Sequence, residues 1–261
     1  MALADRFDGL LIDLDGVVWI GREPVAGSVE ALRTLHDAGK RIVFVTNNPG
    51  QPPEAYAKRL GELGVAVGPE QIVTAGVAVA RLAGEAAAVA DGGAFVIGAS
   101  PLKEMVAATG ARLLEGGEAE AADVVVVSGH KDFNYGELKT AKFALDRGAR
   151  LFATSHDPTM PYPGGELPGT GAVLAAIEVA SGRKATIAGK PERHLFELAK
   201  EAAGEGRLAM VGDRISSDID GGRAAGLETV LVLSGTTSRE QAEAARPAPD
   251  HVLDDLAALL R

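Results

Sequence analysis

Short apolar runs that end in polar or glycine residues alternate with amphipathic stretches along most of this chain. The runs 9–12, 41–45 and 208–211 have the character of buried strands, and the stretches 27–38 and 192–203 have the apolar spacing of helices. Strands that are apolar on both faces and are separated by helices are typical of parallel sheets with crossover connections. The pattern therefore predicts an α/β fold built on a parallel sheet.

A break in this pattern predicts a second domain inserted into the first. Asp91-Gly92-Gly93 has the composition of a turn or linker, and the residues after it have a strand and helix alternation of their own. The first pattern resumes with a predicted strand at 185–188. A segment of about a hundred residues is long enough to fold as a domain. We therefore expect a discontinuous core domain, residues 1–84 and 184–261, and an inserted α/β domain, residues 85–183.

The composition excludes several classes of function. The chain has no cysteine, which rules out disulfides, a thiolate nucleophile and zinc–thiolate sites and favours a reducing compartment. None of the five histidines has metal-binding spacing, so a metal would have to bind carboxylates. The net charge of −10 opposes binding to nucleic acid or anionic lipid. Because no apolar run is long enough to cross a bilayer and no signal segment is apparent, we expect a cytoplasmic protein without a membrane partner.

Two aspartates directly follow the first predicted strand. They stand in the sequence Asp13-Leu14-Asp15-Gly16, at the strand end where open parallel sheets place their ligand crevice. Two neighbouring carboxylates are costly to remove from water, so they favour a bound cation or nearby donors. Taken alone, however, this motif is more often a turn at Asp15-Gly16 with Asp13 capping a helix.

Three further motifs near predicted strand ends carry side chains that suit phosphate chemistry. Thr46 and Asn47 offer a hydroxyl and an amide donor for phosphate oxygens, although both residue types also occur in ordinary turns. Lys190 offers a compact cation, although a solvated loop lysine is the alternative. Asp213 again follows an apolar strand, and for the nearby Asp218 a helix N-cap is the alternative. Chance would seldom produce all of these motifs in this order.

Together these motifs resemble those of the haloacid dehalogenase (HAD) superfamily of phosphohydrolases, subclass IIA, in its NagD-like or 4-nitrophenylphosphatase-type branch. Three intervening segments also resemble the α/β cap of that branch: Ala153-Thr154-Ser155-His156-Asp157, Gly169-Thr170-Gly171-Ala172 and Ser181-Gly182-Arg183-Lys184. The resemblance covers essentially the whole chain. It implies a Rossmann-like core with an α/β cap domain inserted after its third strand, which is where the pattern breaks.

The resemblance also implies catalytic and metal-binding roles. Asp13 would be the nucleophile that forms an aspartyl-phosphate, and Asp15 would act as general acid and then as general base. Mg²⁺ would bind to Asp13, to the backbone carbonyl of Asp15 and to Asp213. The second aspartate, Asp15, favours phosphate esters over carbon–halide substrates, because the dehalogenases of the family lack it. The implied activity is that of a Mg²⁺-dependent phosphatase.

The remaining motif residues would surround the phosphate. Thr46 and Asn47 would position phosphoryl oxygens, and Lys190 would help to neutralise the phosphate dianion. Asp218 would orient Lys190 or a metal-bound water.

The implied cap residues concern the choice of substrate. His156 and Asp157 lie in the segment that overhangs the active site in the family, so the resemblance implies that they contact the substrate. The implied partner is a small phosphorylated metabolite of the sugar phosphate, glycerol phosphate, nucleotide or pyridoxal phosphate type. A homodimer through the cap is a further hypothesis. Trp19 follows the nucleophile loop, where a packed anchor is favoured over a place at the entrance.

Two other functions share part of this motif set. A phospho-receiver switch also combines aspartates, a threonine and a lysine on a doubly wound sheet, but it explains neither Asp15 nor an inserted domain. A phosphosugar mutase shares the first motif but has a helical cap directly after it. Residues 17–26 are too few for such a cap and suit a short flap.

Overall fold

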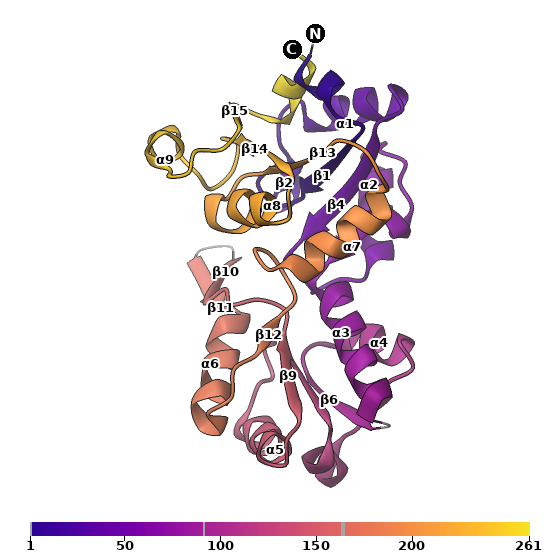
Figure 1. Ribbon diagram of the computed structural model, residues 1–261, viewed down its shortest axis with the longest axis vertical. Coiled ribbons are helices and arrows are strands. Elements are labelled where there is room, and N and C mark those ends of the chain that lie inside the picture. The colour runs from indigo at the N-terminus through magenta and orange to yellow at the C-terminus, as the bar shows by residue number, and fades with distance from the viewer. Residues whose placement is uncertain (1, 91, 163–164) are drawn as a thin grey trace. The chain divides into compact units, whose positions relative to one another are not determined.

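The computed structural model describes residues 2–90, 92–162 and 165–261, and these form two compact units (Figure 1). The first unit comprises the described residues of Met1–Thr46, Pro53–Val73 and Lys190–Arg261. The second comprises those of Asn47–Pro52 and Thr74–Gly189. Each unit has a parallel sheet of its own, so the predicted α/β class is confirmed. Within the described residues, none of the helices combines the length and apolarity that a bilayer crossing requires.

The first unit is built around a six-stranded sheet. Its strands are β1 (Gly9–Asp13), β4 (Arg41–Thr46), β5 (Ile72–Thr74), β13 (Leu208–Gly212), β14 (Glu228–Val232) and β15 (His251–Leu253). A small hairpin follows β1, made of β2 (Trp19–Ile20) and β3 (Glu23–Pro24). The helices are η1 (Leu3–Arg6), α1 (Ser28–Asp37), α2 (Pro53–Glu62), η2 (Pro69–Gln71), α7 (Arg193–Ala203), η4 (Ile215–Ile219), α8 (Asp220–Ala224), α9 (Arg239–Ala244) and η5 (Leu256–Leu260).

The order of the strands reverses at β1. The sheet runs β15-β14-β13-β1-β4-β5, and β1 pairs in parallel with both β4 and β13. The chain builds outward from β1 through β4 and β5, and later outward on the other side through β13, β14 and β15. The strand order therefore reverses at β1, which is where open parallel sheets bind their ligands, at the carboxyl ends of the strands.

The apolar residues of β1 and its neighbours form the core beneath this point of the sheet. Every residue of β1 is buried, and α7 packs across β1 and β4 with Leu195, Phe196 and Ala199 buried beneath it. Burial of each large apolar side chain contributes about 1.5–3 kcal/mol. The strand ends that carry the predicted motifs are thus fixed to a packed sheet.

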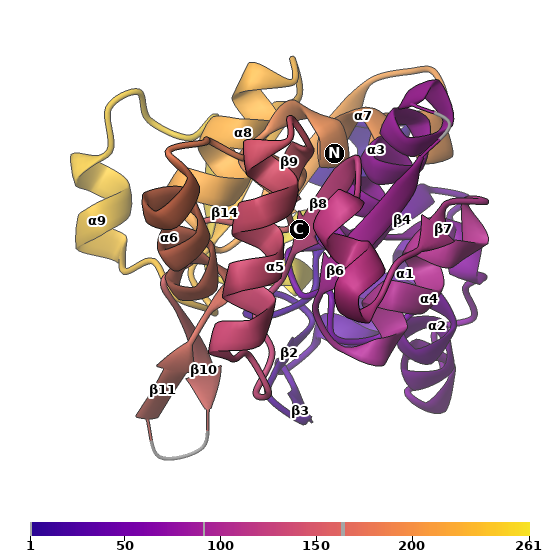
Figure 2. The ribbon, with the colours of Figure 1, turned by 90° about the horizontal axis from the view of Figure 1, so that it is seen from below.

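The second unit has a five-stranded sheet with helices on both faces. Its strands are β6 (Gly93–Ile97), β7 (Arg112–Leu113), β8 (Val124–Val127), β9 (Arg150–Ala153) and β12 (Thr186–Ile187), with a separate hairpin of β10 (Thr159–Tyr162) and β11 (Gly165–Pro168). Its helices are α3 (Ala75–Ala90), α4 (Ser100–Ala108), η3 (Gly116–Ala121), α5 (Tyr135–Asp146) and α6 (Thr170–Ser181). Figures 1 and 2 show α5 and α6 on one face of this sheet and α3 and α4 on the other.

The second unit begins earlier and ends later than the insertion that the sequence predicts. The sequence predicts residues 75–84 and the strand at 185–188 as parts of the core domain, but α3 packs against β8 and β9, and β12 pairs in parallel with β9. The small buried residues of α3, such as Ala78 and Ala83, let this helix lie close to the second sheet. An apolar pattern does not show which of two sheets a helix or a two-residue strand will join. Both predicted boundaries of the insertion therefore differ from those of the second unit.

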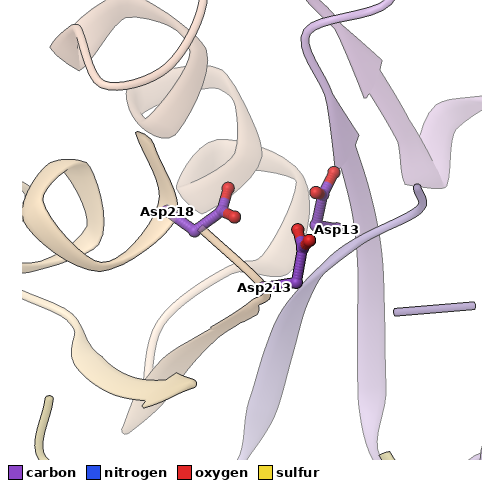
Figure 3. A group of neighbouring side chains, drawn as sticks. All are labelled: Asp13, Asp213 and Asp218. Atoms are coloured by element: carbon purple, nitrogen blue, oxygen red, sulfur yellow. The ribbon is translucent and has the colours of Figure 1, made fainter. Parts of the chain in front are cut away.

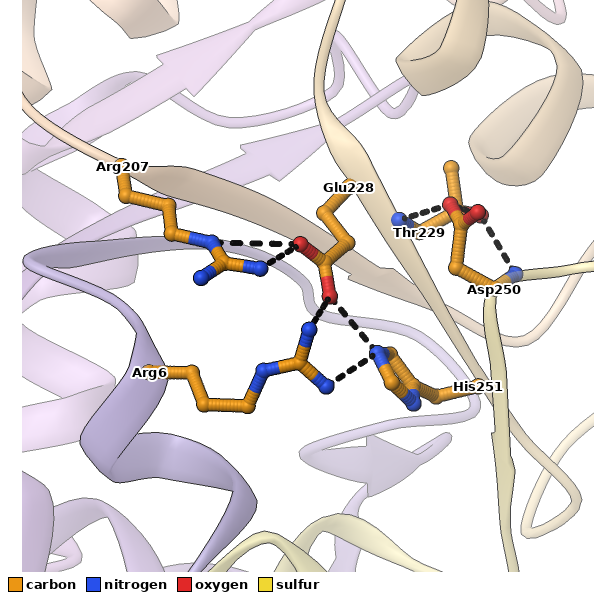
Figure 4. A network of polar contacts seen from close by, with 6 residues as sticks. All are labelled: Arg6, Arg207, Glu228, Thr229, Asp250 and His251. Carbon is orange, nitrogen blue, oxygen red and sulfur yellow. Dashed lines mark hydrogen bonds and ion pairs between the residues drawn. The ribbon is translucent and has the colours of Figure 1, made fainter.

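A network of charged side chains joins β14 to its neighbours in the first unit. Glu228 accepts hydrogen bonds from Arg207 Nη2 at 2.6 Å and from His251 Nε2 at 2.7 Å, and Arg6 Nη2 lies 3.1 Å away (Figure 4). The next residue, Thr229, donates to Asp250 from both its backbone nitrogen and its hydroxyl. Burial alone raises the pKa of both carboxyls, but these hydrogen bonds outweigh it and lower the pKa of Glu228 and of Asp250.

This network predicts a loss of stability in acid. Because the folded pKa of Glu228 is lowered, its contribution is complete above its unfolded pKa of about 4.3 and disappears as the pH falls through the folded value. We expect Glu228→Gln to lower the free energy of unfolding by about 1–2 kcal/mol at neutral pH, and this difference to shrink below about pH 4. Urea unfolding across this pH range measures both effects. The exposed Glu243→Gln is the matched control, and a deficit that stayed constant with pH would contradict the assignment.

Candidate active site

Asp13 is the last residue of β1 and lies at the centre of the candidate site. Only 6% of the residue is exposed. Its Oδ1 accepts a hydrogen bond from the backbone nitrogen of Leu14 at 2.8 Å and forms an ion pair with Lys190 Nζ, also at 2.8 Å. The carboxyl group is therefore held in one orientation at the strand end.

Lys190 connects two buried carboxylates. Its Nζ lies 2.6 Å from Asp218 Oδ1 as well as 2.8 Å from Asp13, and the residue is only 4% exposed. Burial alone lowers the pKa of Lys190, but the two carboxylates outweigh burial and raise it, so the side chain is an ammonium ion at neutral pH. Asp218 Oδ2 in turn accepts from the backbone nitrogen of Arg214 at 3.0 Å. The ion pair between Asp218 and Lys190 is the contact through which Asp218 can orient the lysine.

Asp213 follows β13 and faces the first motif across a narrow gap. The backbone nitrogen of Thr236 donates to its Oδ2 at 2.5 Å, while its Oδ1 is buried and has no hydrogen-bond partner among the described residues. Gly16 has φ of 89° and approaches so closely that a Cβ there would lie 2.5 Å from Asp213 Oδ2. Glycine is therefore required at this position both for its backbone conformation and for space.

The side chains of Asp13, Asp213 and Asp218 form a cluster that fits a divalent cation. One carboxylate oxygen from each lies within 4.8 Å of the others (Figure 3). Burial raises the pKa of Asp13 to about 8, and the charges of Asp218 and Asp213 add to the rise against the opposing effect of Lys190. Burial likewise raises the pKa of Asp213. A bound cation would favour the ionised form of all three carboxyls, which beside one ammonium carry a net charge of −2. Asp213 Oδ1, which has no hydrogen-bond partner among the described residues, is the kind of ligand that Mg²⁺ prefers.

Asp15 differs from Asp13 in its environment. Asp15 is exposed, and its Oδ1 accepts a hydrogen bond from Trp19 Nε1 at 3.1 Å. A carboxyl group that is accessible and oriented beside a buried carboxylate is suited to transfer a proton to or from a bound molecule. Its side chain is absent from the carboxylate cluster, so only its backbone carbonyl is a candidate metal ligand.

Thr46 ends β4, the strand beside β1. Asp13 pairs in register with Val45, so Thr46 lies one residue beyond that pair at the same edge of the sheet. Thr46 is 2% exposed. The first unit thus brings the predicted Thr46 to the sheet edge that carries the buried aspartates.

Comparison with known proteins identifies the family. Residues 10–112 match the family described as haloacid dehalogenase-like hydrolase, and residues 187–259 match a second, HAD-hydrolase-like family. Human chronophin is 36% identical over 95% of this chain and 88% of its own length. This chain belongs to the haloacid dehalogenase-like hydrolases. The resemblance found in the sequence motifs is therefore confirmed.

Solved structures place this HAD-like hydrolase within the NagD-like group. The glycerol phosphate phosphatase of Mycobacterium tuberculosis, crystallised with magnesium, is 36% identical, with a TM-score of 0.90 over 100% of this chain and 78% of its own. NagD from Escherichia coli is 29% identical, with a TM-score of 0.86 over 96% of this chain and 97% of its own. This membership makes the chain an enzyme and removes the phospho-receiver alternative.

The other predicted site residues of this hydrolase belong to the second unit. Asn47 donates from Nδ2 to Asp157 Oδ2 at 3.5 Å, so these two predicted residues are brought together. Asp157 is half-buried and His156 is exposed. His156 lies near Glu178, whose pKa burial alone would raise but which hydrogen bonds from Lys184 and from the backbone nitrogen of Ala185 lower.

Two features of the site were not predicted from the motifs. Thr236 N holds Asp213, but Thr236 stands in a loop after β14, far from every motif in the sequence. Trp19 is a packed residue, as the sequence favours, with 1% exposure, but its indole also binds Asp15. Its position four residues after Asp15 was the available signal for that contact.

Proposed function

We propose that this enzyme is a Mg²⁺-dependent phosphomonoester hydrolase that forms an aspartyl-phosphate on Asp13. The observation that carries the proposal is the buried Asp13 carboxyl, held by Lys190 beside an Asp213 oxygen that has no hydrogen-bond partner in the described part of the chain. A panel of phosphate monoesters, assayed with Mg²⁺ for released phosphate and ranked by kcat/KM, tests it. Turnover of none of the esters would overturn it.

In the first step an oxygen of Asp13 attacks phosphorus and the ester oxygen leaves. Asp15 donates a proton to that leaving oxygen, so that an alcohol departs in place of an alkoxide. In the second step Asp15 accepts a proton from water, the water attacks the phosphorus, and inorganic phosphate departs from Asp13. Asp13 and Asp15 then return to their starting protonation states.

Positive charge is needed because a carboxylate and a phosphate dianion repel each other. Lys190 supplies one such charge beside Asp13, and Asp218 holds its ammonium group in place. When bound by Asp13, the backbone carbonyl of Asp15 and Asp213, Mg²⁺ would supply Lewis-acid neutralisation of the phosphate. Thr46 and Asn47 would donate to the phosphoryl oxygens.

The proposed substrate is a small phosphorylated metabolite. The relative from M. tuberculosis is named a glycerol phosphate phosphatase, which supports this class and the use of magnesium. A mutase is disfavoured because only a short hairpin, β2–β3, separates Asp13 from α1. The cytoplasmic location and a homodimer through the cap stay predictions.

Activity should depend completely on a divalent cation. We expect hydrolysis to stop in excess chelator, to return with Mg²⁺ and to be inhibited by Ca²⁺. Calcium accepts longer bonds and more ligands, so it can draw both oxygens of Asp13 onto the metal and withdraw the nucleophile. Phosphate release after chelation and metal readdition measures this. Full activity in chelator would show that the carboxylate cluster serves another purpose.

We further propose that the cap, predicted as residues 85–183, sets the choice of substrate. Asp157→Ala or His156→Ala should lower kcat/KM about tenfold to a hundredfold for the best ester of the panel, because a polar contact to the leaving group lost on truncation costs about 1–3 kcal/mol. Hydrolysis of 4-nitrophenyl phosphate should change little. The exposed Asp132→Ala is the matched control. An equal loss of kcat/KM for every ester, or no loss for any ester, would mean that neither residue determines the choice of substrate.

A further inference from the structure

The sole tryptophan of the chain is bound to the proposed acid–base residue. Trp19 Nε1 donates to Asp15 Oδ1 at 3.1 Å, across the tight loop that joins β1 to β2. The loop is closed by the backbone: Asp15 and Trp19 form an isolated bridge, and the Gly16 nitrogen donates to the Trp19 carbonyl at 2.7 Å. The geometry of the loop therefore aims the indole N–H at the Asp15 carboxyl group.

A second contact fixes the indole ring itself. The guanidinium carbon of Arg59, on α2, lies 3.8 Å from the centre of the Trp19 ring. Arg59 Nη2 also donates to the carbonyl of Gly21 at 2.7 Å, in the turn between β2 and β3. Arg59 thus joins the ring to the hairpin that carries it, and a cation over an indole face stabilises this arrangement.

Packing alone does not account for the N–H···O contact. Trp19 is 1% exposed, so its ring fills the core, and a phenylalanine would also supply an apolar ring. Asp15, in contrast, is exposed and would be satisfied by water without the indole. What the N–H adds is a fixed orientation: one carboxyl oxygen is held by Trp19, which leaves the other to carry the proton that is transferred.

We propose that Trp19 is a positioning residue that orients Asp15 for proton transfer to the leaving group. This inference rests on the proposed function, because it presumes that Asp15 is the general acid. Trp19 itself need not touch the substrate. The consequence is a dependence on the leaving group: an alkoxide needs the proton of a well-placed acid, whereas 4-nitrophenolate leaves as a stable anion without it.

The variant Trp19→Phe removes the N–H and keeps an aromatic ring. We expect kcat/KM for an alkyl phosphate such as glycerol phosphate to fall about tenfold or more, and kcat/KM for 4-nitrophenyl phosphate to fall by less than about threefold. The ratio kcat/KM is the right quantity, since it reports the steps through the first irreversible one and excludes the later hydrolysis of the aspartyl-phosphate. Phe7→Leu, a change at another buried aromatic residue of the first unit, controls for general loss of packing.

A second measurement requires neither enzymatic activity nor a folded Trp19→Phe variant. Because the protein has one tryptophan, its indole N–H gives a single side-chain signal in a ¹H–¹⁵N spectrum. We expect Asp15→Ala to move the indole proton upfield, as the hydrogen bond to a carboxylate is lost, while exposed Asp37→Ala leaves it unchanged.

The outcomes separate this inference from the function on which it rests. If the wild type hydrolyses no ester, the proposed function fails, whatever the spectrum shows. If the wild type hydrolyses both esters but Trp19→Phe lowers both values of kcat/KM equally, the positioning role is wrong. It is also wrong if the chemical shift of the indole proton does not change in Asp15→Ala. A selective loss for the alkyl ester together with the upfield shift supports it.

Discussion

Asp13→Asn should abolish hydrolysis while leaving the protein folded. The amide has nearly the shape of the carboxylate but is not a nucleophile, so kcat should fall by about four orders of magnitude or more. The fold should persist because the oxygen of the substituted amide can still accept from Leu14 N and Lys190, the contacts that Asp13 makes. Released phosphate and thermal unfolding measure the two effects.

A matched control keeps this result specific. Asp37→Asn makes the same chemical change at an exposed position at the end of α1, and it should leave kcat and stability close to those of the wild type. Multiple turnover of any ester by folded Asp13→Asn protein, at a rate near that of the wild type, would end the assignment of Asp13 as nucleophile.

Lys190→Met should damage both catalysis and stability. Removal of the ammonium leaves Asp13 and Asp218 buried without their shared cation, and breaking a buried pair in this way costs about 3–5 kcal/mol of unfolding free energy. Burial already raises the pKa of Asp13, and without the opposing ammonium charge this pKa would rise further, so less of the nucleophile would be ionised at any pH. We expect kcat/KM to fall about a thousandfold.

A double variant separates the two effects. Adding Asp218→Asn to Lys190→Met removes one of the stranded charges, so much of the lost stability should return while activity stays low. Urea unfolding and kcat/KM are measured on both proteins, with exposed Lys58→Met as the control. Recovery of activity along with stability would mean that Lys190 serves the fold and not the phosphate.

The sequence predicted the central sheet well because its signals were strong and local. The strand at 9–12 was apparent from continuous apolar residues, and the structure has β1 at Gly9–Asp13. The pairing of β12 with β9 was not predictable, because the sequence of a two-residue strand does not indicate which sheet the strand joins. The β10–β11 hairpin was likewise missed, since alternation over so few residues is a weak signal.

The site shows the same division between local and distant information. Recognisable sequence motifs contain four of the site residues, and the structure brings the side chains of these four together: Asp13, Lys190, Asp213 and Asp218. That Asp218 contacts Lys190, and that Asp15 turns to Trp19 in place of the carboxylate cluster, depends on side-chain geometry. Sequence spacing constrains which residues can meet but not which of their atoms do.

The most direct test of the central claim is to trap the phosphorylated residue. The enzyme is mixed with substrate and Mg²⁺, quenched in acid and treated with borohydride, which reduces an aspartyl-phosphate to homoserine. Peptide mass mapping then locates the change. We predict homoserine at position 13, dependent on substrate and lost when a chelator replaces Mg²⁺. Continued turnover with Asp13 unmodified, or the change found at another residue, would contradict the mechanism proposed for this enzyme.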